Sequence, residues 1–80
     1  MTKGIYYNEN YQDKSMDNPL PPQKIQITIH RVMNKTCDAV VIWYEGNGHK
    51  YKRVSKERWL KTAIEWLIND YQLKYIGETW

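Results

Sequence analysis

The sequence predicts an α+β fold, in which a small antiparallel sheet packs on one amphipathic helix in the order β-β-β-α(-β). Isoleucines alternate with polar residues over 24–33, and an Asn-Gly pair at 47–48 separates two strand-like runs. Apolar residues then recur at helical spacing from 59 to 71. We expect a three-stranded sheet, or a four-stranded one if residues 73–76 also pair.

Residues 1–22 are expected to be a flexible N-terminal tail, and residues 23–80 a single small α+β binding domain. The tail is polar and shows no strand or helix period, and its end, Pro19-Leu20-Pro21-Pro22, favours an extended chain. The alternative for Ile5-Tyr6-Tyr7 is an edge strand or a segment that docks on a partner. Because the sequence starts with Met1, we expect a complete small open reading frame.

The three expected strands differ in pattern. In the first, over 24–33, Ile25, Ile27 and Ile29 would share one buried face, and Asn34-Lys35-Thr36 would form the turn that follows. The second, over 37–45, is apolar on both faces, so it should be central. After the turn at 46–48, which suits a tight hairpin, the third strand should span 49–54, with its lysines typical of a sheet edge.

The helix is expected to begin after Ser55, whose hydroxyl can cap the first turn, and to end near 69–71. Val54 and Trp59 have the spacing of a hydrophobic staple. The pairs Glu57–Lys61 and Lys61–Glu65 would add favourable i,i+4 contacts on the outer side of the helix. One helical face would then carry the apolar stripe Trp59, Leu60, Ala63, Ile64, Leu67 and Tyr71.

Composition excludes several classes of protein. A single cysteine, Cys37, permits no intramolecular disulfide, and no apolar run has the length of a membrane span or a signal peptide. We therefore expect a cytoplasmic protein with no membrane partner. His30, His49 and Cys37 are scattered along the chain, and no metal-ligand spacing is present. The sequence thus predicts no enzyme, no catalytic residue, no metal and no cofactor.

Positive charge is concentrated in residues 49–61, which carry six Lys or Arg residues and one acid, Glu57, in a chain of net charge +3. We expect this basic segment to bind DNA or RNA phosphates, with aromatic rings stacking on bases. The predicted phosphate contacts are Lys50, Lys52, Arg53, Lys56, Arg58 and Lys61, and the predicted stacking residues are Tyr51 and Trp43. The alternatives are a solvated edge strand and helix surface, or attraction to an acidic protein.

The second apolar face of residues 37–45 suggests another function. Trp and Tyr residues on an uncovered sheet face are typical of protein interfaces. The alternative prediction is therefore a protein-binding inhibitor or adaptor of the phage or mobile-element type, acting in host takeover or anti-defence through an exposed aromatic sheet face. A homodimer through the same open face is compatible with either function. No motif in the sequence is specific enough to indicate a family.

Overall fold

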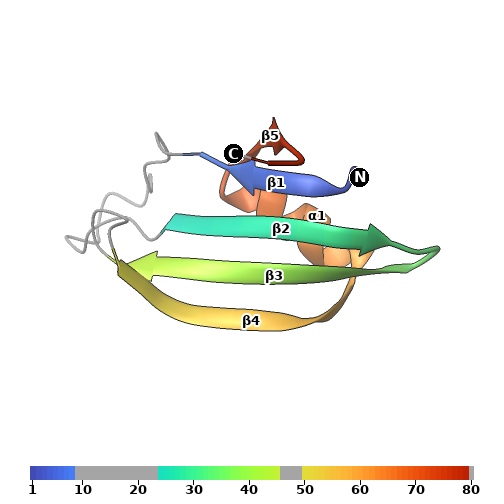
Figure 1. Ribbon diagram of the computed structural model, residues 1–80, viewed down its shortest axis with the longest axis horizontal. Coiled ribbons are helices and arrows are strands. Elements are labelled where there is room, and N and C mark those ends of the chain that lie inside the picture. The colour runs from blue at the N-terminus through green and yellow to red at the C-terminus, as the bar shows by residue number, and fades with distance from the viewer. Residues whose placement is uncertain (9–23, 46–49, 80) are drawn as a thin grey trace.

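A five-stranded antiparallel sheet with one helix on one face forms the fold, in the strand order β4-β3-β2-β1-β5 (Figure 1). The computed structural model describes residues 1–8, 24–45 and 50–79, without the side chains of residues 45 and 50–54. The α+β class and the single helix are confirmed, with one strand more than the largest number expected. The elements are β1 (Gly4–Tyr7), β2 (Lys24–Val32), β3 (Thr36–Glu45), β4 (Lys50–Leu60), α1 (Lys61–Asp70) and β5 (Lys74–Gly77).

Strand β1 corrects part of the expected tail. It lies inside the sheet, between β2 and β5, so residues 4–7 are neither a flexible arm nor an edge strand. The expected strand at 73–76 is confirmed as β5, which pairs with β1 and forms one edge of the sheet. The remainder of the predicted tail, residues 9–22, lies outside the described residues, and so does the turn at 46–48.

Strand β4 is longer than expected, and the helix starts later. Residues 55–60 pair with β3, from Ser55 opposite Val41 to Leu60 opposite Thr36. The predicted cap at Ser55 and the staple between Val54 and Trp59 are therefore wrong, because both features require residues 56–59 to be helical. A shorter β4 would leave the first half of β3 without a hydrogen-bonding neighbour on that side. This requirement outweighs the local helix signals, of which a serine cap contributes about 1 kcal/mol and an i,i+4 pair a few tenths of a kcal/mol.

Helix α1 is secured at both ends by backbone contacts. Its N-cap residue, Leu60, makes no side-chain cap, but the Lys61 amide donates to the Lys35 carbonyl at 3.0 Å in the turn between β2 and β3. At the other end, Gln72 adopts φ +53°. The amides of Gln72 and Leu73 donate to the carbonyls of Asn69 and Ile68. This pattern is a Schellman motif, with Gln72 at the position that glycine usually fills.

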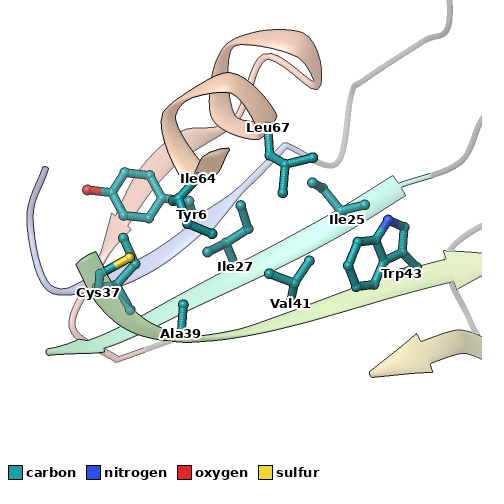
Figure 2. Close-up of a cluster of buried hydrophobic side chains, with 10 residues drawn as sticks. Tyr6, Ile25, Ile27, Cys37, Ala39, Val41, Trp43, Ile64 and Leu67 are labelled. Atoms are coloured by element: carbon teal, nitrogen blue, oxygen red, sulfur yellow. The ribbon is translucent and has the colours of Figure 1, made fainter. Parts of the chain in front are cut away.

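The core lies between α1 and the sheet (Figure 2). Ile64 and Leu67 point from the helix towards the strands, and the odd-numbered residues 25–29 of β2 and 37–43 of β3 meet them. The predicted buried face of the first strand is confirmed. The core cluster consists of Tyr6, Ile25, Ile27, Ile29, Cys37, Ala39, Val41, Trp43, Ile64 and Leu67.

Candidate nucleic-acid interface

The sheet face opposite α1, called the outer face below, carries the even-numbered residues of β3, of the second half of β4, and of β2 as far as residue 30. Side chains alternate between faces along a strand, and the odd-numbered residues 25–29 of β2 and 37–43 of β3 are in the core. The register irregularity after Ile29 shifts this alternation, so Arg31 lies opposite Asp38 and Val32 packs against the core. Register places Thr28, Val40 and Lys56 side by side across the three strands. Arg58 lies opposite Asp38 on the next even-numbered row. The fold therefore gathers cations from β4 beside polar and aliphatic residues of β2 and β3.

An open depression of about 530 Å³ lies at one end of the outer face. Val40 and the exposed residues His30, Lys56 and Arg58 are among the residues that line it. The full lining is His30, Asp38, Ala39, Val40, Lys56, Glu57 and Arg58. Three side chains that can carry positive charge thus surround a shallow, partly apolar surface, which suits an anionic ligand that also has an apolar part.

One acid opposes these cations. Arg58 donates from Nε to Asp38 Oδ1 at 3.0 Å, with side-chain exposures of 62% and 36% for the arginine and the aspartate. An exposed ion pair of this kind contributes only about 0–1 kcal/mol, so an incoming phosphate can compete with Asp38 for the guanidinium. Among the described residues, Lys56 forms no ion pair, and its neighbour Glu57 lies on the helix-facing side of β4 by strand alternation.

Tyr44 lies on the outer face at the opposite end of β3 from Asp38. Its hydroxyl donates to Gln26 Oε1 at 3.0 Å, and its ring makes a T-shaped contact with Tyr7, with centroids 6.3 Å apart. Burial raises the pKa of Tyr44, and the nearby Tyr7 phenol adds to the rise. Tyr44 is therefore a neutral, oriented aromatic ring on the same face as Lys56.

The predicted site residues of the basic segment, residues 49–61, divide into three groups. Lys56 and Arg58 come together at the depression, although they lie on a strand and not on the predicted helix. Lys61 lies apart from them, in the first turn of α1. For Lys50, Tyr51, Lys52 and Arg53, the backbone belongs to β4, and their side chains lie outside the described part of the chain.

Trp43 does not fit its predicted stacking role. It is 7% exposed and belongs to the core between sheet and helix, so its ring cannot be offered to a base. For the same reason it does not contribute to an exposed aromatic sheet face. Tyr44, the next residue, points to the other face, which also carries Lys56 and Arg58. Strand alternation separates these two rings, but it does not indicate which face the helix covers.

His30 is a member of the site that the sequence did not single out. Its signal was present in the alternation of residues 24–33, which places it opposite the buried isoleucines. What brings it to Lys56 and Arg58 is the pairing of β2 with β3 and of β3 with β4, together with an irregularity of register between Ile29 and Arg31. A sequence pattern carries little information about such pairings between distant segments.

The structure separates the histidine and the cysteine that it describes. His30 lines the depression on the outer face, whereas Cys37 is buried on the helix side, so these two residues do not form a dyad. Burial raises the pKa of the Cys37 thiol, Asp38 adds to the rise, and Lys61 opposes it. Within the ranges described, no three His, Cys, Asp or Glu side chains cluster as metal ligands. Nor does any helix in those ranges have the length and apolar character to span a membrane.

No protein-family model, curated protein or solved structure matches this chain. Its function therefore has to be inferred from the arrangement of its residues.

Proposed function

We propose that this chain is a small cytoplasmic nucleic-acid-binding protein that contacts phosphates with its outer face. The observation that carries the proposal is the placement of Lys56 and Arg58 beside His30, around an open depression on the face that α1 does not cover. A linear polyanion can lie across such a surface without entering a cleft. The basic residues at 50, 52 and 53 precede this pair on the same strand, so β4 as a whole has a strong excess of positive charge.

The chemistry of the site favours phosphate as the main ligand group. Lysine and arginine bind phosphate oxygens and release condensed counterions, which makes affinity fall steeply with salt. Arg58 is held by only one contact to Asp38, through Nε, so its terminal nitrogens can still meet a phosphate.

Fluorescence anisotropy of labelled DNA and RNA oligonucleotides, titrated across a range of KCl concentrations, tests this proposal. The variant Lys56→Gln with Arg58→Gln should bind more weakly and with a shallower salt dependence. Each lost contact should reduce the slope of log K against log[salt] by about 0.7 on a single strand, so the pair should reduce it by about 1.4.

The matched control is Lys35→Gln with Lys61→Gln, which removes the same charge from the turn between β2 and β3 and from the first turn of α1. It should keep most of the wild-type slope. Absence of binding by the wild-type protein at low salt would overturn the proposal. An equal loss in both double variants would show that net charge matters and the outer face does not.

A protein-binding inhibitor or adaptor of the phage or mobile-element type is the second candidate, and it would act through the surface of α1 instead of the sheet face. Trp66 is 64% exposed on the outer side of α1, an unusual position for so large an apolar ring. Under this proposal, Trp66→Ala should abolish binding to the protein target in a pull-down, and the variant Lys56→Gln with Arg58→Gln should keep it. The reverse result would favour the nucleic-acid interface.

A further inference from the structure

We infer that the outer face selects single-stranded over double-stranded nucleic acid, with Tyr44 as the base-stacking residue. This inference rests on the proposed function and names its ligand more closely. It follows from three features of the described residues: the width of the sheet, the charge of the helix surface, and the line of residues that connects the depression to Tyr44.

The sheet is too wide to read a duplex from within a groove. Five strands spaced about 4.8 Å apart span about 19 Å, whereas the major groove of B-DNA is about 12 Å wide. A two-stranded ribbon fits that groove, but here β3 and β4 are continuous with three further strands (Figure 1). A duplex could therefore meet the outer face only through its backbone phosphates.

The helix is equally unsuited to a groove. Its inward side is fixed by Ile64 and Leu67 in the core, so only its outward side is available. The exposed residues on α1 include the acids Glu65 and Asp70. Its one basic residue, Lys61, is half-buried in the first turn, and no basic residue lies in its last turn. Negative charge on that surface repels the phosphates that line a groove. Duplex recognition by α1 is thus opposed by the helix's own charge.

A single strand, in contrast, finds both of its components matched on the outer face. Along β3, Val40, Ile42 and Tyr44 occupy successive outer-face positions, all partly exposed. Tyr44 lies four residues from Val40, about 13 Å along the strand. Lys56 is paired with Val40 across the ladder. Unstacked bases can therefore pack on the aliphatic side chains and on Tyr44, while their phosphates reach the cations of β4.

Tyr44 is held in place for this role. Its hydroxyl is fixed by Gln26, and the T-shaped contact with Tyr7 covers at most one face of its ring. A ring that is already oriented loses little conformational freedom when a base stacks on it. Duplex DNA keeps its bases stacked inside the helix, so it gains nothing from Tyr44. The ring therefore contributes to the affinity for single strands alone.

The experiment compares a labelled oligothymidylate of about 20 nucleotides with a duplex of equal length, by anisotropy at one fixed salt concentration. The wild-type protein should bind the single strand more tightly. Tyr44→Leu should weaken single-strand binding about tenfold, equivalent to ~1.4 kcal/mol for one stacked base, and leave duplex binding unchanged. Tyr44→Phe keeps the ring and should retain most of the affinity, and Trp66→Leu removes an aromatic residue from the helix surface as a matched control.

Photocrosslinking of the wild-type protein to an oligonucleotide that contains 5-iodouracil gives a second readout, which does not depend on how the variants fold. The crosslinked peptide should contain Tyr44. Equal affinity for both ligands, or a crosslink confined to other segments, would overturn the inference and leave the proposed function standing. If neither ligand binds at low salt, the proposed function fails as well.

Discussion

Replacing Asp38 with Asn is expected to strengthen nucleic-acid binding. The carboxylate of Asp38 accepts from Arg58 Nε at 3.0 Å and lines the same depression as Lys56. It therefore competes with phosphate for the guanidinium and adds a negative charge at the site. Asparagine keeps the size and the oxygen of the side chain but removes its charge, so Arg58 becomes available to the ligand.

The size of the effect follows from the ion count. One additional phosphate contact should steepen the slope of log K against log[salt] by about 0.7 on a single strand. Over a fourfold rise in salt, the variant should then lose about 2.6-fold more affinity than the wild-type protein, and its advantage should be largest at low salt. The lost ion pair is exposed and contributes about 0–1 kcal/mol, well below the roughly 4–12 kcal/mol expected for a domain of 80 residues, so the variant should fold.

Anisotropy titrations at several KCl concentrations measure this slope. Asp70→Asn is the matched control, because it removes one negative charge from an exposed position at the far end of α1. Its slope should equal that of the wild-type protein. The reasoning would be refuted if Asp38→Asn bound no better than Asp70→Asn, because Asp38 would then not compete with the ligand.

Three further outcomes test the fold. Ile64→Ala should destabilise the protein by about 2–5 kcal/mol in urea unfolding, because Ile64 is fully buried in the core. Trp66→Ala, at an exposed position of the same helix, should change the stability by about 0.5 kcal/mol or less. Similar values for both variants would contradict the placement of α1. Gly4→Ala should lower the melting temperature more than Gly77→Ala. Both glycines have strongly positive φ. An added Cβ at position 4 would approach the carbonyl oxygen of Gly77 to 2.6 Å, whereas an added Cβ at position 77 would have no atom nearer than 3.7 Å. Equal changes in melting temperature would show that backbone strain, and not the close contact at position 4, causes the loss. Stability should fall as pH rises above about 8.5, because the unfolded Cys37 thiol loses its proton there while burial raises the pKa of the folded one and keeps it protonated. The urea midpoint should therefore fall between pH 7.5 and pH 9.5, and it should fall less for Cys37→Ala than for the wild-type protein. The same fall in both proteins would exclude this thiol as the cause.

The parts of the fold that the sequence predicts are those with strong local periodicity. The alternation of Ile25, Ile27 and Ile29 identifies both the strand and its buried face, and Ile64 and Leu67 identify the helix and its inward side. Residues 55–60 were misassigned because their local signals are helical, whereas their conformation is set by pairing with β3. Residues 4–7 were misassigned because four residues are too few to show a period.

The candidate site was predicted only in part, for a related reason. Sequence charge locates Lys56 and Arg58, and the structure places them at one depression. The sequence does not indicate which face of a strand that is apolar on both sides a helix will cover. The helix covers the face that carries Trp43, so Trp43 is buried and Tyr44 remains on the outer face. His30 reaches the site through pairing between separate strands, which no local pattern encodes.

Pairing of β1 with β5 brings segments far apart in sequence into direct contact. The Tyr75 hydroxyl donates to the Lys3 carbonyl at 2.9 Å across 72 residues, whereas β2 and β3 are joined by a short turn. Closing the larger loop costs more chain entropy, so the β1–β5 ladder should form late in folding and open early. While it is open, Ile5 and Tyr6 lie on an unprotected sheet border, where strands of other molecules can add. The short strand β5 thus covers the open edge of β1. During synthesis, this protection from aggregation begins only once residues 74–77 have been made.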